Sequence, residues 1–226
     1  MKILAIETST ELCSAALLRE DELFVEEELA PNRHAERLAP MIRRLLSRAS
    51  LAARNLDAFA FGQGPGSFTG LRIACGMAQG LAFAAARPVI PVPSLLALAE
   101  QANASRVVAA MDARMGETYL AAYSRMGGDW EAAINPGLFQ ADSLPALPGH
   151  DWVATGSGFD AFDWLRAAYS TQVGHRLAGD LPRAGSVARV AARRLARGQT
   201  LAAEKAAPLY LRDKVAMTTE ERQAKR

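Results

Sequence analysis

The feature that most constrains this chain is the stretch GQGPGSFTGLRIACG at residues 62–76. It follows a short apolar run and opens a segment that carries no charged side chain from residue 73 to residue 86. A glycine-rich junction between a buried strand and a helix can present backbone N–H groups to a phosphate. It can equally let two backbones pack closely, because glycine has no Cβ. The choice between these alternatives decides whether the chain is an enzyme.

The known phosphate-binding motifs do not match this stretch. The P-loop pattern needs a lysine after its second glycine, and residues 62–76 contain none. The dinucleotide fingerprint fails as well, since Ser67 stands where its third glycine belongs. What remains is a strand–loop–helix junction with Ser67 or Thr69 as the predicted N-cap. Spacing alone favours a packing turn, in which Gly66 and Gly70 let the chain enter the helix tightly.

Hydrophobic periodicity predicts an alternation of strands and helices over the first hundred residues. Three short apolar runs are typical of a meander, and an amphipathic helix, a buried strand, the glycine loop, a second helix and a further strand follow. This order is half of an actin-like fold. The predicted ranges are 2–8, 13–20 and 23–30 for the meander, 34–49 for the first helix, 56–62 for the strand, 71–86 for the second helix and 89–92 for the last strand.

A second unit is predicted to begin near Ser105, which divides the chain into lobes at 1–104 and 105–226. Residues 107–123 read as two strands joined at Arg114-Met115-Gly116. The region from residue 127 to residue 148 is rich in turn residues and is interpreted as loop. Residues 152–159 resemble a strand running into a Gly-Ser-Gly turn, and an amphipathic helix over 187–199 ends at Gly198.

Composition and charge narrow the class of protein. The chain has 226 residues, half of them hydrophobic, which is enough for one large domain or two lobes. Two isolated cysteines, Cys13 and Cys75, indicate neither a disulfide framework nor a CxxC metal site and fit a reducing cytosol. Only four apolar residues separate Lys2 from Glu7, too few for a signal peptide or a membrane span.

Residues 183–226 carry eleven basic and four acidic side chains, a net charge of +7, while the whole chain carries +2. Such a segment can contact nucleic acid phosphates. A solvated helix face followed by a basic tail is the interpretation that we favour from sequence.

Single residues give weak catalytic signals. His34, His150 and His175 are the only histidines, and no two stand at metal-ligand spacing. Asp112 closes a predicted strand and is interpreted as a turn cap, while His34 is interpreted as a capping or surface residue. Glu7 ends the first strand, where a carboxylate without a metal partner is ambiguous.

Four segments are characteristic of one family: ILAIETSTELCSAAL, GQGPGSFTGLRIACGMAQGLAF, MDARMGETY and PLYLRDKVA. They span almost the whole chain, which resembles the TsaB (YeaZ) family. The resemblance implies an α/β, two-lobed actin-like (ASKHA, ribonuclease H-like) fold with mixed sheets flanked by helices. It also implies a cytoplasmic, noncatalytic partner of TsaD in making N6-threonylcarbamoyladenosine at position 37 of tRNAs that read codons beginning with A.

The same resemblance implies further partners. A P-loop ATPase, TsaE, belongs to the system, and tRNA is expected to be met through the complex rather than at a membrane. Whether the isolated chain forms a homodimer stays open.

A comparison with TsaD indicates that this chain lacks its metal site. In TsaD, histidines four residues apart follow the strand after the glycine-loop helix and hold a metal. Here Ser94 and Leu98 stand in those places. A hydroxyl and an alkyl chain cannot replace two imidazoles on a divalent metal. We therefore expect no catalytic residue, no metal and no cofactor.

The uncharged second helix is expected to be buried all round, on one side by its own sheet and on another by a partner subunit rather than by the second lobe. Glycines four residues apart permit close approach of a partner helix. The expected interface residues are Leu38, Met41, Ile42 and Leu45 on the first helix, and Ile73, Gly76, Met77, Gly80 and Ala84 on the second.

Two rival functions stay open at this point. An actin-like kinase or ATPase would place ATP on the weak cofactor candidates, with residues 155–158 as an adenosine-side turn. A glycoprotease-like metallopeptidase would need the missing histidine pair. The cofactor candidates are Glu7, Thr8, Ser9, Gly64, Gly66 and Ser67.

Overall fold

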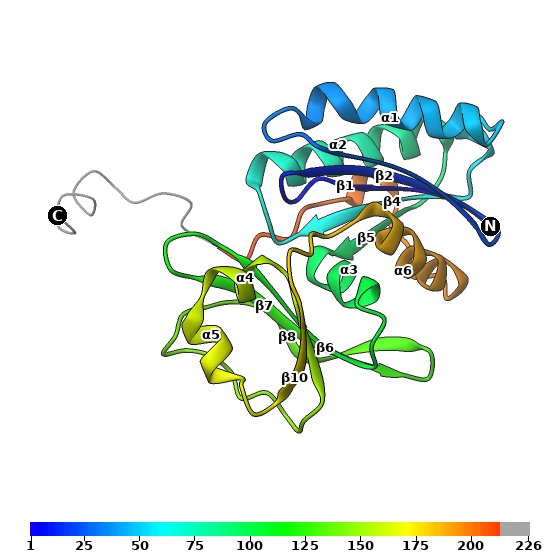
Figure 1. The fold of residues 1–226 in the computed structure, drawn as a ribbon. Helices are drawn as coiled ribbons and strands as arrows, with labels where there is room; N and C mark the ends of the chain where they lie inside the picture. Colours follow the sequence, from blue (N-terminus) through cyan, green and yellow to red (C-terminus); the bar gives the residue numbers. More distant parts are fainter. Residues whose placement is uncertain (213–226) are drawn as a thin grey trace.

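The computed structural model describes residues 1–212 and contains two five-stranded sheets, each flanked by helices (Figure 1). The strand orders are β3-β2-β1-β4-β5 and β10-β9-β6-β7-β8. The first part of the chain forms β1 (Lys2–Glu7), β2 (Leu12–Arg19), β3 (Glu22–Leu29), α1 (His34–Arg48), η1 (Ala53–Asn55), β4 (Ala58–Gly64), α2 (Phe68–Ala85), β5 (Val89–Pro93) and α3 (Ser94–Gln101). The rest forms β6 (Arg106–Asp112), β7 (Thr118–Met126), β8 (Asp129–Phe139), β9 (Trp152–Thr155), α4 (Ser157–Ala161), α5 (Asp163–Ala168), β10 (Val173–Leu177), α6 (Ala184–Ala196) and η2 (Ala203–Lys205).

The first sheet is covered on both faces, which explains why its strands are almost continuously apolar. Helices α1 and α2 lie on one face, and α3 and α6 lie on the other (Figure 1). Successive residues of β1 alternate between them: Leu4 packs on the α1–α2 side, and Ile3 and Ala5 pack on the α3–α6 side. The predicted meander and the fold class are both confirmed.

A single apolar core joins the two lobes. It contains Ile3 and Val92 of the first sheet, Leu95 of α3, and Val107 and Tyr123 of the second sheet. Helix α3 therefore lies between the sheets and contacts strands of both, while α6 packs on the first sheet and on α3. A separate core on the far face of the second sheet is built around Trp152 and Phe159.

The end of the described chain returns to the first lobe. Helix α6 packs against β1 and β2, and Leu201 exchanges backbone hydrogen bonds of 2.8 Å with Val89 of β5. Further along, the Leu209 N–H donates to the Gln63 carbonyl over 2.8 Å. The lobe boundary after residue 104 remains a proposal, and α6 lies on the first sheet although it follows that boundary.

The region from 127 to 148 was predicted to be loop, and this was wrong, because β8 occupies residues 129–139. Pro136 and Gly137 misled the prediction. They are accommodated because β8 is an edge strand whose pairing with β7 shifts register near Leu120 and Ala122, where a proline removes no ladder bond. Within residues 1–212, no helix is both long enough and apolar enough to cross a membrane.

Candidate functional site at the glycine loop and helix α2

The glycine loop packs on the connection between β1 and β2. Ser67 is the N-cap of α2, as predicted, and its Oγ accepts a hydrogen bond of 3.4 Å from the Gly70 N–H. The Ser67 N–H donates to the Ser9 carbonyl over 2.7 Å, and the Thr8 hydroxyl donates to the Gly70 carbonyl over 2.8 Å. At this helix start, the N–H groups of Gly70 and Leu71 thus both bond to Ser67, the second to its carbonyl over 2.9 Å.

Three glycines are needed for this close approach. A Cβ at Gly70 would lie 1.9 Å from the Thr8 carbonyl oxygen, and one at Gly66 would lie 2.4 Å from the Ser9 carbonyl oxygen. A Cβ at Gly62 would lie 1.9 Å from a carboxylate oxygen of Glu7. The geometry supports the interpretation of the loop as a packing junction.

Glu7 is fully buried beneath the loop. Its Oε1 accepts a hydrogen bond of 2.7 Å from the Ser9 N–H, and its Oε2 accepts one of 2.9 Å from the Ser94 hydroxyl. Burial raises the pKa of this carboxyl although these hydrogen bonds lower it. Among the described residues, the buried Ser9 hydroxyl has no hydrogen-bond partner.

Most of the predicted cofactor candidates therefore lie together, but they contact one another. Glu7, Thr8 and Ser9 face the loop, and Gly66 and Ser67 lie directly on them. Gly64 is covered by the returning chain, since a Cβ there would lie 2.9 Å from the Leu209 carbonyl oxygen.

The two positions at which TsaD was expected to hold metal ligands are part of the interior. Ser94 is buried and donates to Glu7, and Leu98 is buried in the core shared by the lobes. The turn at residues 155–158 also packs closely: a Cβ at Gly156 would lie 2.3 Å from the Ala110 carbonyl oxygen and 3.0 Å from Leu98 Cδ1. In the described part of the chain, no three His, Cys, Asp or Glu side chains are grouped so that they could hold a metal ion.

The outer face of α2 is open. Gly76 and Gly80 are exposed, and no atom lies within 4 Å of a Cβ placed at either position. Ile73 and Met77 are half-buried, and Phe83 is 76% exposed. Neither the first sheet nor the second lobe covers this face, so its burial by a partner subunit stays a prediction.

The expected interface residues of α1 are core residues. Leu38, Met41, Ile42 and Leu45 are at most 4% exposed and pack between α1 and the first sheet. This part of the interface prediction was wrong, because the single apolar face of α1 packs entirely against the first sheet. Helical periodicity identified this face but not the surface that it covers.

The sequence predicted the role of Asp112 correctly and that of His34 incorrectly. Asp112 is a turn cap, as predicted, since its Oδ1 accepts a hydrogen bond of 2.7 Å from the Arg114 N–H. His34 is neither a side-chain cap nor a surface residue: it is 6% exposed, and its Nδ1 has no partner among residues 1–212. Burial lowers the pKa of His34.

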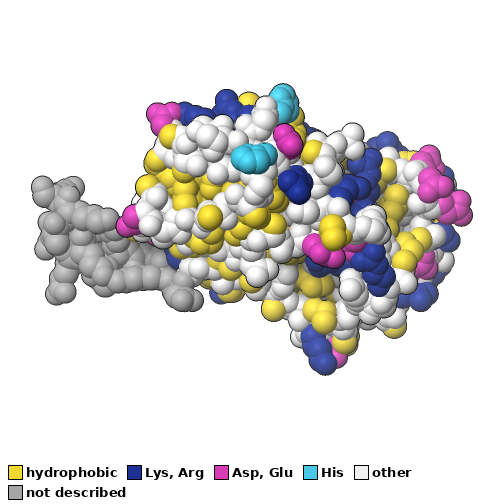
Figure 2. Space-filling view, turned by 90° about the horizontal axis from the view of Figure 1, so that it is seen from below, with side chains coloured by type: hydrophobic (Ala, Val, Ile, Leu, Met, Phe, Trp, Pro, Cys, Tyr) yellow, Lys and Arg dark blue, Asp and Glu magenta, His cyan; other side chains and the backbone are white. Residues whose placement is uncertain are grey.

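The basic C-terminal segment is more structural than a solvated face. Arg183, Arg193, Arg197 and Arg212 form ion pairs with Glu27, Glu100, Asp129 and Glu117, respectively. On the face drawn in Figure 2, Lys and Arg side chains lie beside Asp and Glu and do not form a surface of one sign. Arg222, Lys225 and Arg226 lie outside the described residues.

Comparisons with known proteins give one consistent result. The model of the family described as "TsaD: tRNA N6-adenosine threonylcarbamoyltransferase" matches residues 25–220. The Escherichia coli (strain K12) protein named "tRNA threonylcarbamoyladenosine biosynthesis protein TsaB" is 40% identical and covers 96% of each chain. Its namesake from Haemophilus influenzae is 37% identical and covers 95% of each chain. The solved structure of YeaZ from Pseudomonas aeruginosa is similar with a TM-score of 0.82 at 40% identity, over 93% of this chain and 99% of that one.

Proposed function

The chain belongs to the TsaB family, and we propose that it serves tRNA threonylcarbamoyladenosine biosynthesis as the noncatalytic partner of a TsaD-type transferase. The product is N6-threonylcarbamoyladenosine at position 37 of tRNAs that read codons beginning with A. The observation that carries the noncatalytic role is the packing of the glycine loop on residues 7–9. The loop backbone, the Glu7 carboxylate and the Thr8 hydroxyl all form hydrogen bonds within the chain, so these groups are not free to bind a nucleotide.

The surroundings of Glu7 support the same role. Both of its carboxylate oxygens accept hydrogen bonds from within the chain, from the Ser9 N–H and the Ser94 hydroxyl. A general base or a metal ligand needs an oxygen that can reach a substrate or an ion. Ser94 and Leu98 cannot supply the imidazole ligands that a divalent metal would need at this depth.

The outer face of α2 is the proposed contact with the transferase. It consists of Ile73, Gly76, Met77, Gly80 and Ala84, with Phe83 beside them. A glycine inside a helix costs about 1 kcal/mol relative to alanine. Gly76 and Gly80 contact nothing in their own chain that would require a glycine. Close approach of a partner helix accounts for both, and a second copy of the chain is the alternative occupant when the transferase is absent.

The remaining partners follow from the family. A TsaE-type ATPase joins the complex, tRNA is bound through the assembled complex, and the reaction takes place in the cytoplasm. A protein that binds the tRNA backbone directly presents a basic surface to its phosphates. On the face drawn in Figure 2, carboxylates lie beside the arginines, which supports an indirect role in tRNA binding.

Reconstitution tests the proposed function. The purified chain, TsaD and TsaE of the same organism are supplied with tRNA, ATP and the threonylcarbamoyl-AMP donor, and each protein is then omitted in turn. We expect modified adenosine only when both this chain and TsaD are present. Threonylcarbamoyl transfer by this chain without TsaD would overturn the noncatalytic role, and full activity of TsaD and TsaE without this chain would overturn the partnership.

A further inference from the structure

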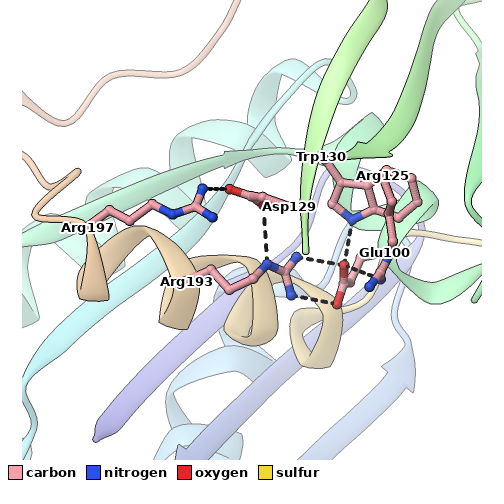
Figure 3. Close-up of polar contacts among 6 residues, drawn as sticks. All are labelled: Glu100, Arg125, Asp129, Trp130, Arg193 and Arg197. Carbon is pink, nitrogen blue, oxygen red and sulfur yellow. Dashed lines mark hydrogen bonds and ion pairs between the residues drawn. The ribbon is translucent and has the colours of Figure 1, made fainter. Parts of the chain in front are cut away.

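A cluster of five charged side chains and one tryptophan joins the two lobes at the end of β7. It consists of Glu100, Arg125, Asp129, Trp130, Arg193 and Arg197 and is called here the Glu100 cluster (Figure 3). Glu100 of α3 is 7% exposed. It accepts hydrogen bonds from Arg125 Nη2 over 3.0 Å, from Trp130 Nε1 over 2.6 Å, and from both Nη atoms of Arg193 over 3.1 and 2.7 Å.

Asp129 extends the cluster from the start of β8 to α6. Its carboxylate accepts a hydrogen bond of 3.3 Å from Arg193 Nε and pairs with Arg197. Although burial raises the pKa of Asp129, the Trp130 backbone N–H and the two arginines hold it below its ordinary value. The contacts of Asp129 and Arg125 therefore tie the β7–β8 hairpin of the second lobe to α3 and α6, which pack on the first sheet.

A second tie lies at the other end of β7. Arg212 follows the residues 207–209 that pair with Gln63 and cover Gly64 in the first lobe. Its guanidinium donates to the Ala113 carbonyl over 2.9 Å and pairs with Glu117, both in the turn between β6 and β7. Both partners of this ion pair are largely buried, with side chains 15% and 16% exposed.

Strand β7 is thus held to the first lobe at both ends. Its nine residues separate the two ties by about 26 Å, at a rise of about 3.3 Å per residue. The apolar core between the lobes is nondirectional and by itself tolerates relative motion of the lobes. Arginine–carboxylate pairs have a defined geometry. One tie would act as a hinge, whereas two ties this far apart oppose rotation.

We propose that the Glu100 cluster and Arg212 form a two-ended lock that holds the lobes in one relative orientation. The chain then presents the outer face of α2 and the second lobe as one rigid body. The two ends of the lock differ, since the Glu100 cluster is made by α3, α6 and the β7–β8 hairpin, and the second tie depends on Arg212 in the returning segment.

Distance measurements between spin labels on the full chain test the lock. Cysteines replace the exposed residues Arg43 on α1 and Ala167 on α5, and the parent chain serves to show that buried Cys13 and Cys75 take up no label. The lock is cut at both ends in Glu100→Ala/Asp129→Ala/Arg212→Gln, which removes both acceptor carboxylates of the Glu100 cluster and the guanidinium of the second tie. The matched control is Arg189→Gln/Lys205→Gln, which changes two exposed cations that form no ion pair within residues 1–212.

We expect one narrow distance distribution in the parent and the control, and a clearly broadened one in the triple variant. A folded triple variant with the parent distribution would overturn the lock, because the apolar core alone would then fix the orientation.

Single-end variants keep the test decisive if the triple variant fails to fold. Arg193→Gln leaves Glu100 bonded to Arg125 and Trp130, and Arg212→Gln leaves Glu117 bonded to Gln140. We expect Arg212→Gln to accelerate amide exchange about tenfold at residues 113–117 and not at 126–130, with the reverse pattern for Arg193→Gln. Unchanged exchange at the cut end in both variants would refute the lock.

Discussion

Ser94 and Glu7, 87 residues apart in the chain, form a buried hydrogen bond of 2.9 Å between the start of α3 and the end of β1. In TsaD, the position of Ser94 is expected to hold a metal-binding histidine. Here the hydroxyl instead satisfies a carboxylate that lies directly under the glycine loop. Ser94 therefore occupies the expected position of a metal ligand and at the same time supports the packing of the loop.

Glu7→Gln is expected to stabilise the chain at neutral pH. Because burial raises the pKa of Glu7, the folded chain binds this proton more tightly than the unfolded chain does. The associated stability is complete below the unfolded pKa of about 4.3 and is lost as pH rises through the folded pKa. Glutamine keeps the shape and can still bond to Ser9 and Ser94, so we expect a gain on the order of 1 kcal/mol at pH 7.

Denaturant unfolding of both proteins between pH 4 and pH 8 measures this gain. The difference in unfolding free energy should grow with pH, while Glu11→Gln, at an exposed carboxylate, should track the parent. A difference that does not change with pH would show that Glu7 does not titrate as proposed.

Two glycines of α2 should respond in opposite directions to the same change. Gly70→Ala drives a methyl group into the Thr8 carbonyl and should destabilise the fold by about 1–3 kcal/mol. Gly76→Ala meets open space in the single chain and should stabilise it by about 1 kcal/mol, the helix propensity of alanine over glycine. The melting temperatures of both variants and the parent measure these effects. A shift of the same sign in both variants would contradict the described packing of the loop.

His34 is expected to make the fold sensitive to mild acid. Burial lowers its pKa, although a hydrogen bond with the Thr10 backbone raises it, so the folded chain binds this proton less tightly than the unfolded chain. The stability is present above the unfolded pKa of about 6.5 and is lost as pH falls below it.

Unfolding free energies at pH 7.5 and pH 5.5 check this expectation. His34→Gln should reduce the loss of stability between these pH values, whereas the exposed His175→Gln should leave it unchanged. An equal loss in the parent and in His34→Gln would mean that other groups cause it.

Sequence predicted the first lobe well because its signals are local. The apolar runs at 2–8 and 13–20 and the N-cap at Ser67 depend on residues that are neighbours in the chain. β8 was missed because Pro136 and Gly137 are turn residues by propensity, and only their place on a sheet edge makes them acceptable.

The site was less predictable because it depends on which surface the apolar face of each helix packs against. The apolar face of α1 could be identified from the period of its hydrophobic residues. The same period does not show that the first sheet, and not a partner, covers Leu38 and Met41. The close contact of Gly62 with Glu7 joins residues far apart in the sequence, and nothing in either local pattern indicates it. The ties of Arg193 and Arg212 to the second lobe are long-range in the same sense.

The outer face of α2 is the proposed contact with the transferase, and Gly80→Arg tests this contact. Gly80 is exposed with open space around it, so the isolated variant can keep its guanidinium in water and should stay folded by circular dichroism. Association would bury an unpaired charge, and even about 3 kcal/mol of penalty lowers affinity more than a hundredfold. Met77→Arg, on the same face but half-buried, should behave alike, while Ala167→Arg on α5 adds the same charge away from it.

The most direct measurement is the dissociation constant of TsaD from the same organism for the parent, Gly80→Arg and Ala167→Arg, by titration calorimetry. We expect Ala167→Arg to bind like the parent and folded Gly80→Arg to bind at least about a hundredfold more weakly. A folded Gly80→Arg chain that binds TsaD with the parent's affinity would contradict a contact at the outer face of α2.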